Sequence, residues 1–255
     1  MSWLDETMVG FDTETTGVST ANDRIVTAAV ITRTGAAVTA RTWLIDPGIE
    51  IPDAASAVHG ISTEQARASG VQPPEALEQI AAILAQALNA GFPVVAYNAQ
   101  FDLTILEAEL ARHGLSSLAS RLDAGTARPI VDPYVIDRHL DRYRKGPRKL
   151  IDLCRIYAVT VEADHLHAAD ADVLATLDLV QALASSYPAL REVSLDSLHD
   201  QQISAYRDWA VNFAAYLKSR GVTEDLPDPR WPVAPREAAA STPQATAKKG
   251  PGTLF

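Results

Sequence analysis

The order of strand-like and helix-like segments constrains the fold of this chain more than any other feature of its sequence. Three segments rich in Val, Ile and Thr, 8–13, 24–33 and 37–45, fill the first fifty residues and predict an antiparallel meander. Beyond them, short apolar runs at 93–97 and 129–132 alternate with helical patterns. This order predicts an α/β domain of about 185 residues, in which helices cover a mixed sheet.

Several segments carry apolar residues at helical spacing and predict helices. They cover 73–90, 101–110, 150–157, 168–183 and 198–217. The sequence leaves three alternatives open for the last of these helices: it packs on the core, forms a dimer interface, or docks another protein.

We divide the chain into a domain at 1–185, a helical extension at 186–222 and a tail at 223–255. The tail is dominated by Pro, Ala, Thr and charged residues. Such a composition buries too little apolar surface to offset the entropy of ordering, so the tail is predicted to be disordered.

Composition indicates a soluble protein. Hydrophobic residues make up 47% and charged residues 21%, and no stretch is apolar enough to span a bilayer. The first residues, Met1 to Glu6, lack the pattern of a secretory signal. A single cysteine, Cys154, excludes an internal disulfide framework. We therefore expect a cytoplasmic protein without a membrane segment.

The formal charge of −10 argues against nonspecific wrapping of nucleic acid, because Lys and Arg supply most of that affinity. Any nucleic-acid contact must then be local. The segment 137–149 qualifies, since it carries six Lys or Arg against two Asp. The alternative interpretation is a solvated helix end and loop.

Two acids stand at the end of the first strand, in Phe11-Asp12-Thr13-Glu14-Thr15-Thr16-Gly17. Because side chains alternate along a strand, Asp12 and Glu14 project to the same face and can share an ion. A hard cation would remove their repulsion, and oxygen ligands favour Mg²⁺ or Mn²⁺ over Zn²⁺. The alternative is a polar strand end that leads into a Thr-Gly turn.

Two further segments place acids where chemistry is common. Asp102 follows a buried strand and opens a helix, although it could equally be a helix-start residue favoured by the macrodipole. The segment 165–172 offers a histidine as a general base near an acid. Two pairs there have the same spacing, His165 with Asp170 and His167 with Asp172.

These segments together resemble the DEDDh exonucleases, the superfamily of the epsilon proofreading subunit of bacterial DNA polymerase III and of ribonuclease T. The resemblance covers roughly residues 8–184. Its first motif matches 11–17 in full, its second matches 98–102, and its third is a histidine five positions before an aspartate. Small residues and Thr176 that follow the third motif fit the register of His167 and Asp172, so we choose that pair and keep His165 and Asp170 in reserve.

The resemblance implies a ribonuclease H-like fold with a mixed five-stranded sheet, two Mg²⁺ or Mn²⁺ ions, and release of nucleoside 5′-monophosphates from a 3′ end. It implies that His167 is the general base. The implied metal ligands are Asp12, Glu14, Asp102 and Asp172, with Asp102 acting through water.

The resemblance also suggests residues that contact the terminal nucleotide. Thr15, Thr16 and Gly17 could bring backbone amides close to it, Asn98 could make a polar contact, and Phe101 could stack on a base. Phe101 could instead belong to the core. His59 lies in a segment predicted to be a loop beside that nucleotide, or it is an ordinary surface residue before a turn.

We expect the substrate to be the 3′ end of nucleic acid, with single-stranded DNA favoured over RNA, in DNA repair or replication; a proofreading role would need a separate polymerase. One alternative is an RNA-trimming or oligonucleotide exonuclease, and another is a non-catalytic adaptor of a replication or repair complex. The terminal Leu254-Phe255 resembles a sliding-clamp-binding peptide, although Pro251 stands where such peptides usually carry Gln.

Overall fold

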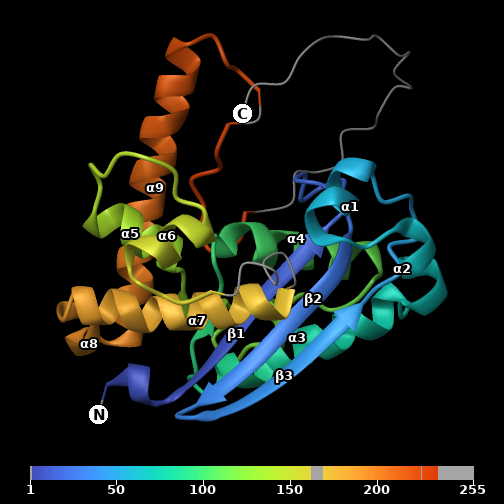
Figure 1. Cartoon of the computed structure of the whole chain (residues 1–255), viewed down its shortest axis with the longest axis horizontal. Coiled ribbons are helices and arrows are strands. Elements are labelled where there is room, and N and C mark those ends of the chain that lie inside the picture. Colours follow the sequence, from blue (N-terminus) through green and yellow to red (C-terminus); the bar gives the residue numbers. More distant parts are fainter. Residues whose placement is uncertain (1, 162–168, 225, 235–255) are drawn as a thin grey trace.

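The computed structural model describes residues 2–161, 169–224 and 226–234. All the predicted strands and helices are present, together with four further α-helices among the described residues, α1, α2, α5 and α8 (Figure 1). The elements in chain order are η1 (Trp3–Asp5), β1 (Thr7–Thr15), β2 (Ile25–Thr34), β3 (Ala37–Leu44), α1 (Asp53–His59), α2 (Thr63–Ser69), α3 (Pro73–Asn89), β4 (Val94–Val95), α4 (Ala99–Arg112), η2 (Ala119–Arg121), β5 (Ile130–Val131), α5 (Pro133–Leu140), α6 (Leu150–Ile156), α7 (Ala169–Ser186), α8 (Ala189–Glu192) and α9 (Leu195–Ser219).

Within the described residues, one five-stranded sheet has the order β3-β2-β1-β4-β5. β1 pairs with β2, and β2 with β3, in antiparallel fashion. β4 runs parallel to β1, and β5 runs parallel to β4. The predicted mixed sheet, which begins with a meander, is confirmed. Because β1, β4 and β5 are parallel, their carboxyl ends meet at one edge of the sheet.

β1 lies at the centre of the sheet, and its side chains alternate between two cores. Val9 and Phe11 face a core built with α3 and α4, whereas Met8 faces the core that α7 closes. Helix α7 packs across β1 and β2 (Figure 1). Gly10 permits this contact, because a Cβ added there would lie 2.3 Å from Val173 Cγ1. The same alternation places Asp12 and Glu14 on the α7 face and Thr13 on the α4 face.

The first half of α9 belongs to the domain core. Five of its side chains are buried, from Leu198 to Ala210. Two of them cover the edge strand β5: Gln202 Nε2 donates to the Ile130 carbonyl at 3.0 Å, and the Ile130 N–H donates to His199 Nδ1 at 3.1 Å. Of the three alternatives for this helix, its first half therefore follows the one in which it packs on the core.

The chain beyond α9 returns to the domain, which corrects part of the predicted tail. Trp231 is 5% exposed and belongs to the α3–α4 core. The Ala234 N–H donates to Thr104 Oγ1 at 2.9 Å. Residues 226–234 are thus packed rather than disordered, and the extension at 186–222 shares a core with 1–185. The rest of the predicted tail, including Leu254-Phe255, lies outside the described residues.

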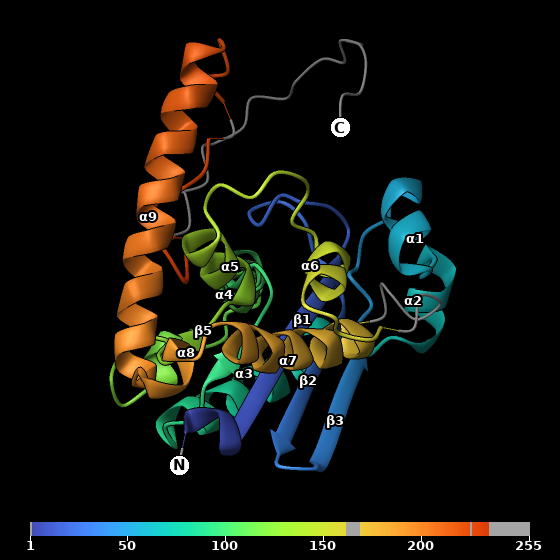
Figure 2. The same cartoon turned by 60° about the vertical axis from the view of Figure 1, so that its left-hand side comes forward.

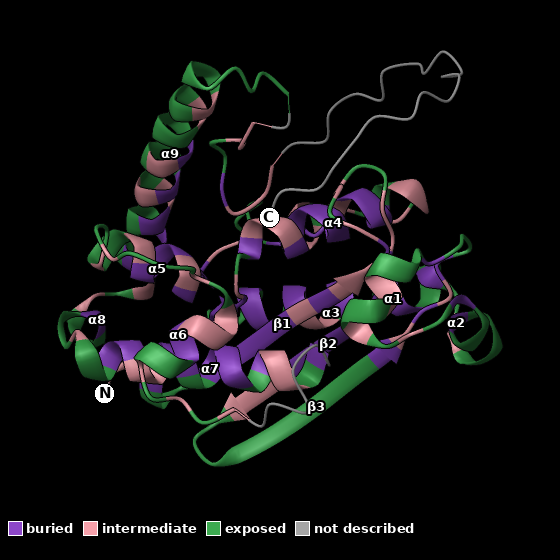
Figure 3. Ribbon diagram, turned by 45° about the horizontal axis from the view of Figure 1, so that its top comes forward, coloured by how far each residue is buried: buried purple, intermediate pink, exposed green. Residues whose placement is uncertain are grey.

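The segment around His59 is a helix, not the predicted loop. α1 is short, Ala-rich and flanked by Pro52 at its N-cap and Gly60 at its C-cap, where φ is 76°. Proline before a helix and a left-handed glycine after it are recognisable helix signals. Burial is concentrated on the sheet and its covering helices, while β3 and the far turns of α9 are exposed (Figure 3). In the part of the chain described here, no helix is long and apolar enough to cross a membrane.

Candidate active site

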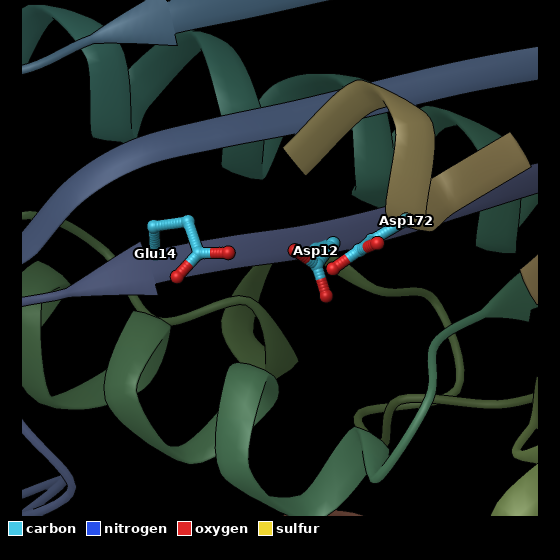
Figure 4. Close-up of side chains that lie close together, drawn as sticks. All are labelled: Asp12, Glu14 and Asp172. Carbon is cyan, nitrogen blue, oxygen red and sulfur yellow. The ribbon is translucent and has the colours of Figure 1, made fainter. Parts of the chain in front are cut away.

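Three carboxylates meet at the carboxyl end of β1. Asp12 and Glu14 extend from the strand, and Asp172 extends from the first turn of α7. One carboxylate oxygen of each lies within 4.8 Å of the others. Figure 4 shows the three carboxylates turned toward one another. The predicted shared face of Asp12 and Glu14 is confirmed by this geometry.

The structure distinguishes between the two acids left open in the third motif. Asp172 lies with Asp12 and Glu14, whereas Asp170 is exposed and accepts a hydrogen bond from the Ala171 N–H at 3.0 Å. Asp172 is therefore the acid that belongs to the cluster. Both candidate bases, His165 and His167, lie outside the described residues.

Asp102 reaches the same edge of the sheet from the first turn of α4. It is 3% exposed, and its Oδ1 accepts hydrogen bonds from Thr13 N–H at 3.0 Å and Thr13 Oγ1 at 2.7 Å. These bonds fix one carboxylate oxygen toward β1. Asp102 is close enough to Asp12 to raise its pKa, but it is not one of the three acids within 4.8 Å of one another.

Burial and mutual repulsion make these carboxylates reluctant to ionise together. Burial raises the pKa of Asp12 well above its usual range, and the charges of Asp102, Asp172 and Glu14 add to the rise. Burial, with Asp172 and Asp102, raises the pKa of Glu14 from 4.5 to about 7. Burial also raises the pKa of Asp102 to about 7 against the opposing Thr13 hydrogen bonds.

This cluster fits a hard divalent cation. Its donors are all carboxylate oxygens, the ligands that Mg²⁺ and Mn²⁺ prefer. In residues 2–161, 169–224 and 226–234, no lysine or arginine forms a salt bridge with Asp12, Glu14 or Asp102. Among the described residues, Asp12, Glu14 and Asp102 thus concentrate negative charge without a salt-bridge partner.

A family comparison identifies the domain around this cluster. The model of the RNase T family, described as an exonuclease, matches residues 9–180. That range includes all four acids and most of the sheet and its helices. The chain belongs to this exonuclease family. The predicted superfamily of DEDD-type exonucleases is confirmed.

Relatives and solved structures agree with this assignment. The exonuclease domain is 31% identical over 176 residues to a PolC-type DNA polymerase III of Lacticaseibacillus paracasei, a match that covers 69% of this chain and 11% of the relative. A PolC-type polymerase of Streptococcus thermophilus is 30% identical over 178 residues, with 68% and 11% covered. The chain therefore spans about a tenth of these relatives.

The fold is that of exonuclease I. E. coli exonuclease I in complex with a dA16 oligonucleotide has a TM-score of 0.62 at 21% identity, covering 79% of this chain and 44% of that one. A second structure of exonuclease I has a TM-score of 0.61 at 20% identity, covering 73% and 42%.

The loop after β1 is predicted to contact a nucleotide. Hydrogen bonds within the chain hold part of this loop. The Thr16 N–H donates to the Arg24 carbonyl at 2.9 Å, and Thr16 Oγ1 donates to Asp23 at 2.9 Å. The Thr16 amide thus already has a partner within the chain, and its contact with a nucleotide stays a prediction. For Thr15 and Gly17 the contact also stays a prediction.

His59 lies against this loop, as expected for a residue near the terminal nucleotide. Its Nδ1 accepts a hydrogen bond from the Ile61 N–H at 3.2 Å, which leaves the ring proton on Nε2. Burial lowers the pKa of His59, and the Thr15 backbone partly offsets this effect. A neutral imidazole beside Thr15 is positioned to donate one hydrogen bond.

Asn98 and Phe101 occupy the start of α4 in different ways. Asn98 is exposed and adopts the left-handed region, with φ 60° and ψ 46°. Its side chain makes no capping hydrogen bond, so it is available for a polar contact. Phe101 is half-buried and packs against the α3–α4 core, in line with the alternative interpretation of this residue. Its contact with a base stays a prediction.

Sequence reasoning missed Asp132, which positions the helix that carries Asp102. Asp132 is fully buried and accepts the Asn98 N–H at 3.1 Å and the Ala99 N–H at 2.9 Å, at the start of α4. It also caps α5 through the Tyr134 N–H at 3.0 Å. The signal was present, because an Asp before Pro133 at a strand end is a recognisable N-cap.

The basic segment 137–149 is partly an internal structure. Asp137 is fully buried and accepts hydrogen bonds from Arg144 Nη2 at 2.8 Å, from Arg148 Nη1 and from the Tyr157 hydroxyl at 2.8 Å. Arg144 and Arg148 are therefore not free to guide a nucleic acid. The expected phosphate contacts narrow to the exposed residues, such as Arg142 and Lys145.

Proposed function

We propose that this protein is a metal-dependent 3′→5′ exonuclease that removes nucleoside 5′-monophosphates from single-stranded DNA. The observation that carries the proposal is the meeting of Asp12, Glu14 and Asp172 within 4.8 Å, in a domain that belongs to the exonuclease family. Clustered carboxylates are costly in a binding module, which disfavours the alternative of a non-catalytic adaptor.

Each acid has a distinct task in this proposal. Asp12, Glu14 and Asp172 would hold divalent cations, which stabilise the negative charge that develops on the phosphoryl oxygens. Asp102 would support the cations through water, since Thr13 holds its Oδ1. Thr13 thereby keeps the Asp102 carboxylate oriented before substrate arrives. His167, five positions before Asp172, would accept the proton of the attacking water.

DNA is the proposed substrate because the relatives are DNA polymerases and the fold is that of an enzyme solved with a DNA oligonucleotide. RNA trimming remains the second candidate, because none of the residues assigned here reads the sugar 2′ position. A role in replication or repair would join this domain to partners, since the match covers only 11% of a relative's length. Leu254-Phe255 is proposed as a sliding-clamp contact only through its resemblance to clamp-binding peptides.

The test is cleavage of 5′-labelled single-stranded DNA with Mg²⁺ or Mn²⁺, beside a matched RNA and an EDTA control. We expect a ladder that shortens from the 3′ end and that disappears with EDTA, Asp12→Ala or His167→Ala. The control is Asp170→Asn, which changes an exposed acid two residues from Asp172 and should leave the ladder intact. Metal-independent cleavage, or none on either polymer, would refute the proposal; preference for RNA would favour the second candidate.

A further inference from the structure

A groove lies away from the carboxylates, between α5 and α9. It has a volume of about 770 Å³. α9 stands beside α5 and rises beyond it, so that its last turns leave the domain surface (Figure 2). The groove lies between these projecting turns and the segment that follows α5. The family match ends at residue 180, so it includes the α5 side of the groove but not the α9 side.

An aromatic row lines the α9 side of this groove. Trp209, Phe213 and Tyr216 recur on one helical stripe. Trp209 and Phe213 have centroids 5.6 Å apart and planes 18° apart, and Phe213 and Tyr216 are 6.3 Å and 15° apart. Phe213 is 39% exposed and Tyr216 is 56% exposed. Rings that are nearly parallel, regularly spaced and exposed form a surface suited to successive flat groups.

Arginines line the opposite side. The Arg138 guanidinium lies 4.2 Å from the Trp209 ring centroid and donates to the Tyr134 hydroxyl at 2.7 Å. These contacts fix its orientation across the groove. Arg142 is exposed at the groove wall. Neither arginine forms a salt bridge with any residue that the structure describes.

The acids that line the groove do not cancel this charge. Asp200 pairs with Arg128 at 3.1 Å, and Asp208 lies 3.7 Å from Arg207. The chain has a formal charge of −10, yet this aromatic groove holds two arginines that form no salt bridge with a described acid. Their charge is complementary to an anion, and the rings beside them favour an anion that carries planar groups.

The first turn of α5, which helps to line the groove, follows the edge of the sheet that holds the carboxylates. β5 ends at Val131, and α5 begins two residues later. Asp132, between them, holds the start of α4, which carries Asp102. Because β1, β4 and β5 are parallel, this junction and the carboxylates share one edge. A polymer bound at the carboxylates can therefore continue toward Arg138 and the aromatic row.

We propose that the groove between α5 and α9 binds the part of a single-stranded nucleic acid that lies 5′ of the cleaved end, through stacking on Trp209, Phe213 and Tyr216 and phosphate contacts from Arg142. This inference rests on the proposed function, because it makes the occupant the substrate of the same site. An acidic peptide or a second copy of the chain would use the rings without requiring continuity with the carboxylates. Those occupants are outcomes of the test.

Binding is measured first, so that hydrolysis plays no part. Fluorescence anisotropy in EDTA, with Asp12→Asn as the background, compares DNA oligomers of about 4 and about 16 nucleotides. Phe213→Ala and Tyr216→Ala should each weaken binding of the longer oligomer by about fivefold or more. The matched control is Val211→Ala, which removes a 55% exposed apolar side chain outside the groove.

Charge is tested in the same assay. Arg142→Ala should lower the slope of log affinity against log salt by about 0.7, the value for one phosphate contact on a single strand. Lys218→Ala, which removes an exposed charge of α9 outside the groove, should leave the slope unchanged. Equal slopes for both variants and the parent would exclude Arg142 from the binding site.

Cleavage then separates this inference from the proposed function. With Mg²⁺ or Mn²⁺, the ratio of kcat/KM for the long oligomer to that for the short one should fall in Phe213→Ala and Tyr216→Ala but not in Val211→Ala. If the parent cleaves DNA while the aromatic variants bind the long oligomer as tightly as Val211→Ala does, the groove serves a peptide or a second copy and the inference is overturned. If the parent cleaves nothing but the aromatic variants lose binding, the proposed function fails and the groove assignment stands.

Discussion

Two buried acidic centres in this molecule contrast in how their charge is compensated. Asp137 is surrounded by Arg144, Arg148 and the Tyr157 hydroxyl, so its charge has direct partners. Around Asp12 the described charges that act on it are those of other acids, and burial together with those acids raises its pKa. The chain itself neutralises the first centre, whereas the second gathers carboxylates that suit a cation. Buried charge that the chain itself neutralises indicates a structural role, and buried charge that it leaves in excess indicates a ligand.

The two centres also differ in how they are assembled. The Asp137 centre draws all its residues from 137–157, a short and mostly local segment. The carboxylate site joins Asp12 on β1, Asp102 on α4 and Asp172 on α7, which lie far apart in the sequence. A change far from the carboxylates can therefore disturb them, while the Asp137 centre depends on its own neighbourhood. Four predictions test this contrast.

The largest effect is expected from Asp12→Asn. Loss of this central ligand should lower the cleavage rate by at least about 10³-fold, because charge stabilisation at the reacting phosphate is lost. In EDTA the same variant should be more stable than the parent, since one buried charge no longer repels the others. Its Tm should rise by about 2–4 °C for each kcal/mol of repulsion removed. Thermal unfolding with excess EDTA measures the second effect.

The control for this gain is Asp170→Asn, whose acid is exposed and outside the cluster. Its Tm in EDTA should match that of the parent. A fall in the Tm of Asp12→Asn would mean that the cluster is neutralised in the metal-free protein, and the contrast between the two centres would disappear.

Asp137→Asn should lower the stability of the protein, whereas Asp12→Asn in EDTA should raise it. This change leaves Arg144 and Arg148, which are 15% and 11% exposed in their side chains, without their acidic partner. Breaking a buried ion pair from one side costs about 3–5 kcal/mol. Urea unfolding should show this loss, and Asp141→Asn, at a half-exposed acid that also contacts Arg144, should cost far less. If Asp137→Asn leaves the free energy of unfolding unchanged, water rather than Asp137 compensates the charge of the arginines.

Much of the carboxylate site could be predicted from sequence, and the Asp137 centre could not. Strand alternation places Asp12 and Glu14 on one face whatever surrounds them, and Asp102 follows from a strand that leads into a helix. A run of arginines, in contrast, has the same sequence pattern whether it faces solvent or a buried acid. The choice depends on how α5, α6 and the segment between them pack, which no local pattern encodes.

The C-terminal region shows the same limit. The helical pattern of α9 was predicted, but its role in covering β5 depends on Gln202 meeting Ile130, a contact between residues distant in sequence. Trp231 lies in a segment whose composition predicts disorder, yet its indole is buried in the α3–α4 core. One large aromatic side chain can anchor a segment that is otherwise poor in apolar residues.

The third prediction tests the long-range assembly of the carboxylate site. Gly10→Ala would place a methyl group 2.3 Å from Val173 Cγ1 and push the start of α7, with Asp172, away from β1. Overpacking of this kind costs about 1–3 kcal/mol, and a displacement of about 1 Å can lower the rate up to about 10²-fold. Val173→Ala removes the clashing atom, so the double variant should recover cleavage relative to Gly10→Ala. Strictly additive losses in the double variant would show that Asp172 is not positioned through this contact.

The smallest predicted effect is the pH dependence of stability and of Mn²⁺ affinity. Its sign follows from the raised pKa of Glu14. Because burial and neighbouring acids raise that pKa from 4.5 to about 7, the folded metal-free protein keeps a proton that the unfolded chain releases. The associated stability is present at low pH and is lost as pH rises through about 7.

Bound Mn²⁺ requires the deprotonated form, so its affinity should increase by up to about tenfold per pH unit below 7 for each proton displaced. The Tm measured at pH 6 and pH 8 should therefore show a larger gain from Mn²⁺ at pH 8, and Asp137→Asn should keep that difference because its centre lies outside the site. A gain from Mn²⁺ that is equal at both pH values would mean that the carboxylates are already ionised at pH 6, and that burial and the neighbouring acids do not raise the pKa of Glu14.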